Sequence, residues 1–302
     1  GNAELAAAGA DPEARILAAY DDSLQLAVAP PEERKAVAFP YLPAPKTAGR
    51  IARKNEISDL SIVQVDFENG VRLNLKQTGF EANEVIASLV FGEGESSEPL
   101  QKAGLSELSE SVINQSGVGP LDQDDLERAL AGKNTAVGFQ VNQQNFAFRG
   151  RTVTEEVALL FQLLHAHMTD PAFREEAYQL AMDRYQQAYR ELAQSIDGAM
   201  TLQGRQFLAG GDPRFGMPPF EAFNELTLDD IRSWIAPKLR NTPLELSIVG
   251  DFDIEKVIDL AARYFGSLPE RPVNPTDELS RLPRFPDGES LRIVVDTKIP
   301  KG

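Results

Sequence analysis

Apolar residues recur with two different periods along the chain, and the changes of period mark out the expected elements. The segment "LSIVQVDFENGVRLNLKQT", residues 60–78, alternates apolar and polar positions on both sides of Asn69-Gly70. Alternation about an Asn-Gly pair is the strongest short signal of a β-hairpin. A third strand is predicted over "EVIASLVFG", where the apolar run is more continuous and deeper burial is expected.

Helical periodicity dominates most of the remaining chain. Helices are predicted over residues 100–115, 122–131, 154–168, 171–193, 196–208, 227–239 and 253–269, and further strands at about 136–141, 144–149 and 243–250. This order is not a regular alternation of strand and helix. The pattern therefore predicts an α+β fold, a largely antiparallel sheet with helices packed on one face.

The two ends of the chain differ from its middle. Residues 1–32 are predicted to form a helix that opens at Asp11-Pro12 and serves as the tail of a preceding domain. Residues 33–55 are rich in proline and are interpreted as a linker. The domain itself is expected over 56–270, and 271–302 as a linker followed by a strand, 291–295, that opens a following domain. On this interpretation the chain is a piece of a longer protein.

Composition excludes several classes of function. The 302 residues are 42% hydrophobic and 25% charged, which is typical of a globular protein, and the formal net charge is -16. A surface of this sign repels nucleic acid and anionic lipid; it keeps the protein soluble and would attract basic peptides. The absence of cysteine excludes disulfides, thiolate metal sites and cysteine nucleophiles. No apolar run approaches the ~20 residues of a membrane span.

Two candidate motifs are interpreted as structural. His165 and His167 are the only histidines, and at positions i and i+2 of a helix they point in different directions and cannot share a metal ion. The acidic run from Asp122 to Asp125 lacks the glycine and the distant glutamate of a calcium loop. It is explained as the capped start of a helix.

Glu107 and Glu110 are the remaining candidates for chemistry. They lie one helical turn apart and are expected on the same face of the helix predicted over residues 100–115. Two carboxylates can act as acid and base, or they can hold a hard cation. Glutamates are also favoured in the first turns of a helix by its dipole, so the pair has a structural explanation as well.

Four segments, in order, resemble one family of enzymes. They are "VDFENGVRLNLKQT", "KAGLSELSESV", "LTLDDIRSWIAPKL" and "LSIVGDFDIEKVIDLAARYFGSLPERP". Together they are similar to the insulinase/pitrilysin family of zinc metallopeptidases, whose active-site helix carries H-x-x-E-H. The resemblance implies an insulinase-like metallopeptidase domain over most of the chain.

The same resemblance implies a degenerate site. The first zinc histidine of the family falls on Glu107, the catalytic glutamate on Glu110 and the second histidine on Ser111, while the third ligand falls near Ala181. A catalytic zinc needs three protein ligands. We therefore expect no metal, cofactor or catalysis in this domain, and zinc only in the catalytic half of the parent.

The function implied is that of a non-catalytic lobe of a bacterial-type insulinase-like zinc endopeptidase, which forms a wall of the peptide-binding chamber. Its partners would be the catalytic domain, on the same chain or on a partner subunit, and the peptide substrate, and its location periplasmic or exported. One alternative is a purely structural module for assembly. A second is a peptidase with a non-standard metal site that uses Glu107 and Glu110.

Overall fold

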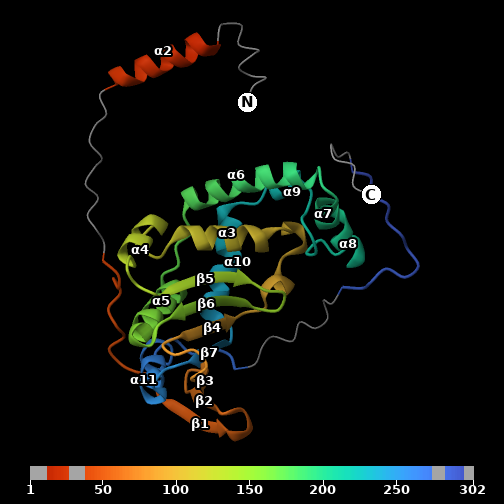
Figure 1. Ribbon diagram of the computed structural model, residues 1–302. Helices are drawn as coiled ribbons and strands as arrows, with labels where there is room; N and C mark the ends of the chain where they lie inside the picture. Colours follow the sequence, from red (N-terminus) through yellow and green to blue (C-terminus); the bar gives the residue numbers. More distant parts are fainter. Residues whose placement is uncertain (1–11, 27–37, 274–282, 296–302) are drawn as a thin grey trace. The chain divides into compact units, whose positions relative to one another are not determined.

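The computed structural model describes residues 12–26, 38–273 and 283–295. It divides into two compact units, residues 1–36 and 37–302. In the first unit the described part is helix α2, Pro12–Gln25, which agrees with the helix predicted there. In the second unit a seven-stranded sheet is the central element (Figure 1).

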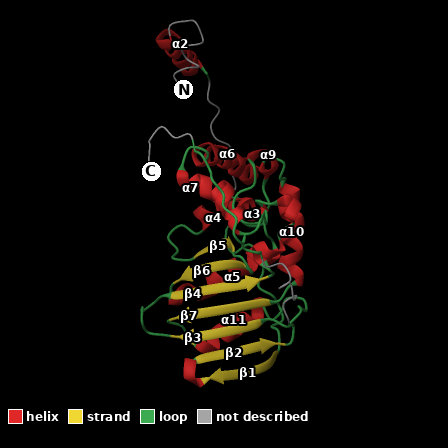
Figure 2. Cartoon of the chain, turned by 90° about the vertical axis from the view of Figure 1, so that its right-hand side faces the viewer, coloured by secondary structure: helices red, strands yellow, loops and turns green. Residues whose placement is uncertain are grey.

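The sheet has the strand order β1-β2-β3-β7-β4-β6-β5 (Figure 2). Every neighbouring pair is antiparallel except β3 with β7, which is parallel. The strands are β1 Ile51–Ile57, β2 Ile62–Phe67, β3 Arg72–Gln77, β4 Val85–Phe91, β5 Ala136–Val141, β6 Phe146–Thr152 and β7 Leu244–Gly250. The α+β fold with a largely antiparallel sheet is therefore confirmed.

Helices cover one face of this sheet. The larger ones are α3 Leu105–Ser116, α4 Gln123–Ala129, α5 Val157–Thr169, α6 Glu175–Leu192, α10 Leu228–Asn241 and α11 Ile254–Tyr264. Helices α5 and α11 lie directly behind the strands in Figure 2. Shorter elements are the 3₁₀ turn η2 Gly94–Ser97, α7 Ile196–Ala199, a π-helical turn Met200–Gly204, α8 Arg205–Leu208 and α9 Phe220–Phe223. None of the described helices is long and apolar enough to cross a membrane.

The core lies between the sheet and the helices because strand residues alternate between the two faces. In β4, Val85, Ala87 and Leu89 are fully buried, whereas Ile86 between them is 50% exposed. Strand β4 is thus buried on one face, although its continuous apolar run suggests burial on both. A second, smaller apolar cluster forms around Val118 and Leu121, and Phe39, Tyr41 and Leu42 pack against it.

Strand β1 differs from the expectation that residues 33–55 form a linker. Residues 51–55 pair with β2 at the edge of the sheet, and they were missed because β1 has no apolar alternation. Its side chains are exposed, and two of its cations form ion pairs, Arg53 with Asp66 at 2.7 Å and Lys54 with Glu255 at 2.7 Å. Charged edge strands of this kind are protected from aggregation.

Two other expectations concern the C-terminal half. The helix predicted over 171–193 begins at Glu175, and the one over 196–208 is divided into α7, the π-helical turn and α8. Residues 291–295, expected to be a strand, form none in the described part of the chain. The assignment of 271–302 to a linker and a following domain stays a prediction.

Candidate functional site

Helix α3 carries the candidate residues on the side opposite to its core contacts. It begins after Gly104, whose φ of 90° places it in the left-handed region. A Cβ at this position would approach the ring of Phe223 to 2.7 Å, so the tight entry to the helix requires glycine. Leu105 and Leu108 then face the core, which leaves the positions of Glu107, Glu110 and Ser111 for the other side.

A pocket of about 370 Å³ lies along this side of α3. It is lined by Glu95, Ser106, Glu107, Glu110, Ser111, Asn114, Val141 and Tyr185. The structure thus brings together the three residues that the helical spacing places on one face.

Ala181, near which the resemblance puts the third zinc ligand, does not line the pocket. Ala181 is 1% exposed and belongs to the hydrophobic core. Tyr185, one turn further along α6, lines the pocket instead, and its hydroxyl donates a hydrogen bond to the carbonyl oxygen of Glu107 at 2.9 Å. Burial and the nearby carboxylates of Glu107 and Glu110 raise the pKa of Tyr185, so its hydroxyl stays protonated.

Sequence reasoning missed Glu95, Val141 and Tyr185, which reach the pocket from η2, β5 and α6. They are distant in sequence from α3, so no local spacing connects them to it. One signal was available for Glu95. It stands in the segment "FGEGESSE", which precedes α3 and contains three glutamates.

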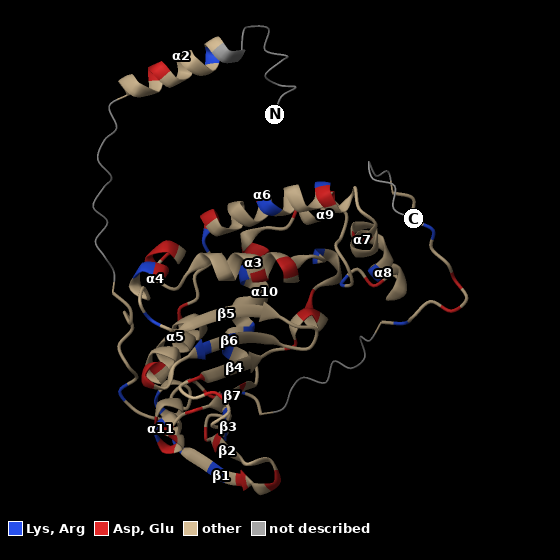
Figure 3. Cartoon of the chain, in the orientation of Figure 1, with Lys and Arg blue, Asp and Glu red and all other residues tan. Residues whose placement is uncertain are grey.

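Acidic residues set the electrostatics of the site, and Figure 3 shows their positions in red on the ribbon of α3 and of the segment before it. Burial, followed by the charge of Glu107, raises the pKa of Glu95 to about 7. Burial is also the largest cause of the raised pKa of Glu107. At neutral pH the Glu95 carboxyl is therefore partly protonated, unlike that of a surface glutamate.

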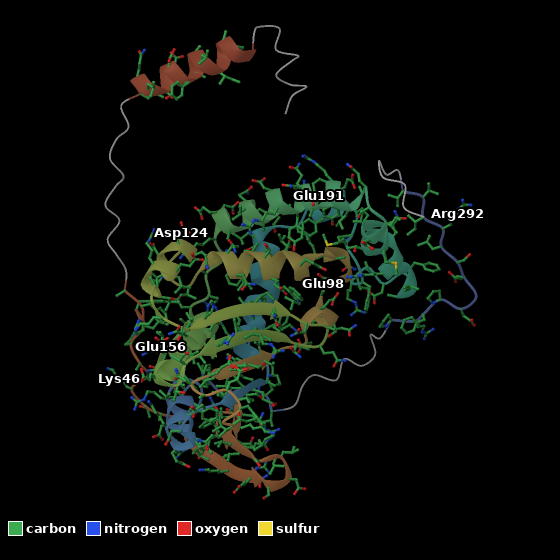
Figure 4. All side chains as sticks on the ribbon, viewed as in Figure 1. Lys46, Glu98, Asp124, Glu156, Glu191 and Arg292 are labelled. Atoms are coloured by element: carbon green, nitrogen blue, oxygen red, sulfur yellow. The ribbon has the colours of Figure 1, made fainter. Side chains whose placement is uncertain are left out.

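Glu98 lies beneath the start of α3 (Figure 4). It is 1% exposed, and its Oε1 accepts hydrogen bonds from the backbone N–H of Ser106 at 2.7 Å and from the Ser106 hydroxyl at 3.1 Å. Its Oε2 has no hydrogen-bond partner among the described residues. Burial raises the pKa of Glu98 to about 8, so this carboxyl is largely protonated at neutral pH.

The residues present do not fit a zinc ion. The pocket offers three carboxylates, hydroxyls and an amide, but no imidazole. Within residues 12–26, 38–273 and 283–295, no group of three or more His, Cys, Asp or Glu side chains is placed to hold a metal ion. Ser111 is a poor zinc ligand, and the Oε2 atom of Glu107 lies 2.9 Å from the hydroxyl oxygen of Ser106.

Both histidines lie on α5 and contact different neighbours. The His167 ring is 5.1 Å from that of Phe148, and burial lowers the pKa of His167 to about 4. The His165 ring is 5.5 Å from that of Tyr264. This agrees with the structural roles expected for them. Asp122 likewise caps α4 by accepting a hydrogen bond from the N–H of Asp125.

Comparison with known proteins agrees with the geometry of the site. Residues 225–300 match the family model described as "Peptidase M16 inactive domain". The chloroplastic stromal processing peptidase of Arabidopsis thaliana is 22% identical over 213 residues, and that of Oryza sativa subsp. indica 24%. This chain is related to the inactive domain of the M16 peptidases. The match covers the C-terminal part of the chain, and the pocket on α3 lies outside it.

Solved structures share the fold of this chain. The ferredoxin protease FusC, in a mutant form complexed with Arabidopsis ferredoxin, superposes with a TM-score of 0.67 at 19% identity over 91% of this chain. The periplasmic protease PqqL from Escherichia coli gives 0.66 at 23% identity over 89%. A peptidase M16 inactive domain from Pseudomonas fluorescens gives 0.60 at 15% identity over 72%.

The chain is much shorter than these relatives. It spans 17% of the length of the stromal processing peptidases and 30% of the FusC and PqqL chains, but 53% of the Pseudomonas domain.

Proposed function

We propose that this domain is the non-catalytic lobe of an M16 zinc endopeptidase, where it forms a wall of the peptide chamber while another domain carries out hydrolysis. The observation that carries the proposal is the pocket on α3. It is lined by Glu107, Glu110 and Ser111, the residues on which the resemblance puts the family's first zinc histidine, catalytic glutamate and second zinc histidine.

The chemistry of the pocket supports contact with peptide rather than catalysis. Glu95, Glu107 and Glu110 line it without a zinc-binding set of ligands. A cavity of this charge favours lysine and arginine side chains, and the net charge of -16 favours the approach of basic peptides. Such a wall would hold part of a peptide whose scissile bond lies elsewhere.

The partners and the location belong to the same proposal. FusC was solved with a bound ferredoxin, and PqqL is a periplasmic protease, whereas the curated relatives are chloroplastic. We infer for this domain a catalytic M16 half as partner, a polypeptide as ligand and a periplasmic or exported location.

The test combines this protein with the catalytic half of its parent. Hydrolysis of a fluorogenic peptide with basic residues is measured for wild type, for the double variant Glu95→Gln/Glu107→Gln and for Glu127→Gln, an exposed control on α4. The pocket variant is expected to raise KM several-fold with kcat little changed, and the control to leave both unchanged. Equal KM values for all three proteins would contradict peptide binding by the pocket and would favour a structural module that only supports assembly.

A further inference from the structure

Strand β5 stands at the edge of the sheet, with β6 on one side and helix α3 on the other. An edge strand normally presents unpaired N–H and C=O groups along its outer side. Extended peptides use such groups when they bind as an additional strand. The pocket on α3 lies at this same edge. Whether the outward N–H and C=O groups of β5 are free or already hydrogen-bonded therefore decides whether a peptide can bind here as an additional strand.

Asn114 of α3 pairs with Phe139 as a neighbouring strand would. Its Oδ1 accepts a hydrogen bond from the N–H of Phe139 at 2.8 Å, and its Nδ2 donates to the carbonyl oxygen of Phe139 at 2.8 Å. The side-chain amide of Asn114 thus forms hydrogen bonds with both the N–H and the C=O of Phe139. The Nδ2 group also donates to the carbonyl oxygen of Glu110 at 2.9 Å, which fixes its orientation on the helix.

Glu110 continues the same arrangement one turn earlier on the helix. Its Oε2 accepts a hydrogen bond from the N–H of Val141 at 2.9 Å. The spacing is well matched, because four residues of helix advance about 6 Å and two residues of strand advance about 6.6 Å. A helix that runs alongside an edge strand in the opposite direction can therefore form hydrogen bonds with every second strand residue through side chains at i and i+4.

The closure continues past the end of β5. The backbone N–H of Glu95 donates to the carbonyl oxygen of Asn142 at 3.0 Å, and that of Ser96 to the carbonyl oxygen of Gln143 at 2.9 Å. From Phe139 to Gln143, the protein's own residues thus bond backbone groups at four positions.

We propose that Asn114 and Glu110 close the edge of β5, so that peptide cannot bind to this domain by adding a strand over residues 139–141. The ligand class, an extended peptide, rests on the proposed function. Glu110 is then a positioning residue that holds an edge strand through its amide, and not a remnant base. Peptide binds to this domain through side-chain contacts in the pocket, and its backbone forms strand-like hydrogen bonds only with other domains.

The experiment measures amide hydrogen exchange residue by residue in the whole protein. Wild type is compared with Asn114→Ala/Glu110→Ala and with Asn74→Ala, a control in the same sheet whose amide bonds only side chains, Gln64, Glu245 and Ser247. In the double variant, exchange at Phe139 and Val141 is expected to rise roughly tenfold. The amides of Gly138 and Gln140, which alternate toward β6, should change much less.

A second measurement tests the opened edge directly. The probe is a fluorescein-labelled decapeptide of alternating valine and threonine, added to each protein. The double variant should bind it and regain protection at Phe139 and Val141, whereas wild type and the control should not.

Two results would overturn the proposal: binding of the probe to wild type with added protection of β5, or unchanged exchange at both amides in the folded double variant. If the double variant does not fold, the single variants Asn114→Ala and Glu110→Ala replace it; exchange should then rise at Phe139 in the first and at Val141 in the second, and unchanged exchange at the named amide in either folded variant would overturn the proposal. These results are independent of whether a catalytic half gains activity from this domain, so the closed edge and the proposed function can fail separately.

Discussion

Glu98 holds a proton that the unfolded chain has already released at neutral pH. Its pKa is raised from 4.5 to about 8 by burial. Since the folded state binds the extra proton between these values, stability falls as the pH rises from about 4.5 to about 8 and stays low above. We expect Glu98→Gln, which imitates the protonated form, to be more stable than wild type at pH 9 by several kcal/mol and to differ little at pH 4.5.

Urea denaturation at pH 4.5, 7 and 9 measures this difference. Some pH dependence remains in the variant, because the pKa values of Glu95 and Glu107 are raised as well. Glu127→Gln on the surface serves as the control. A variant whose stability falls with pH as steeply as that of wild type would mean that Glu98 is ionised in the folded protein.

A zinc site can be rebuilt on α3 if the pocket has the geometry described. Glu107→His and Ser111→His place two imidazoles at i and i+4 on one helix face. We expect this double variant to gain weak zinc affinity, and the further change Tyr185→Glu to strengthen it, because Tyr185 lines the same pocket. Competition with a chromogenic chelator measures the affinities.

Ala181→Glu is the matched comparison for the third ligand. Ala181 is 1% exposed in the core, so a carboxylate there should destabilise the fold by several kcal/mol and add no zinc affinity. Stronger zinc binding with Glu at 181 than at 185 would show that α6 presents a different residue to the pocket.

These residues show what the sequence determines about the site. The common face of Glu107, Glu110 and Ser111 follows from helical spacing alone, and the pocket lining confirms it. The contributions of Glu95 and Tyr185 depend on how η2 and α6 pack against α3, which is a matter of tertiary contacts. The proton on Glu98 depends on burial, which no local pattern reveals.

At the scale of elements, the Asn69-Gly70 turn does more than connect two strands. The Asn69 Nδ2 group donates to the carbonyl oxygens of Phe265 and Leu268, at 2.8 and 3.0 Å, next to the end of α11. Its Oδ1 accepts from the N–H of Val71 at 3.2 Å. The hairpin was predicted from sequence, but this connection to a helix 196 residues later was not.

Asn69→Asp separates the two roles. Asp-Gly suits such a turn about as well as Asn-Gly, so a turn alone predicts little change. The aspartate would lose the donor and place its charge against carbonyl oxygens at a helix end, so we expect a loss of about 2 kcal/mol. Chemical denaturation measures it, with Asn69→Ala expected to cost less. Equal stability of Asn69→Asp and wild type would show that only the turn matters.

Strands were predictable from sequence where one face is buried. The runs of β2, β3, β5 and β7 alternate in burial and agree with the prediction, whereas the exposed, charged β1 gave no signal. The parallel pairing of β3 with β7 was beyond reach for another reason. It joins residues more than 170 positions apart, and no periodicity within either strand specifies the partner.

At the scale of the whole molecule, we expect the isolated protein not to hydrolyse peptides. The pocket lacks a zinc-binding set of residues, and the Glu110 carboxylate is bonded to the N–H of Val141. Incubation of purified protein with a fluorogenic peptide, with and without chelator, measures this. Chelator-sensitive turnover that disappears in Glu110→Gln would contradict the expectation, and turnover that persists in that variant would identify a contaminating protease.

The place of β7 between β3 and β4 also determines when the domain can form during synthesis. Until residues 244–250 have left the ribosome, the nascent chain can build only two separate half-sheets, β1-β2-β3 and β4-β6-β5, each with an open inner edge. Both edges are apolar on one face, with Leu73 and Leu75 on β3 and Leu89 on β4. Exposed edges of this kind attract other chains. The last strand of the sheet to be translated is therefore the one that joins its halves, and translation that stops before Leu244 leaves an aggregation-prone intermediate.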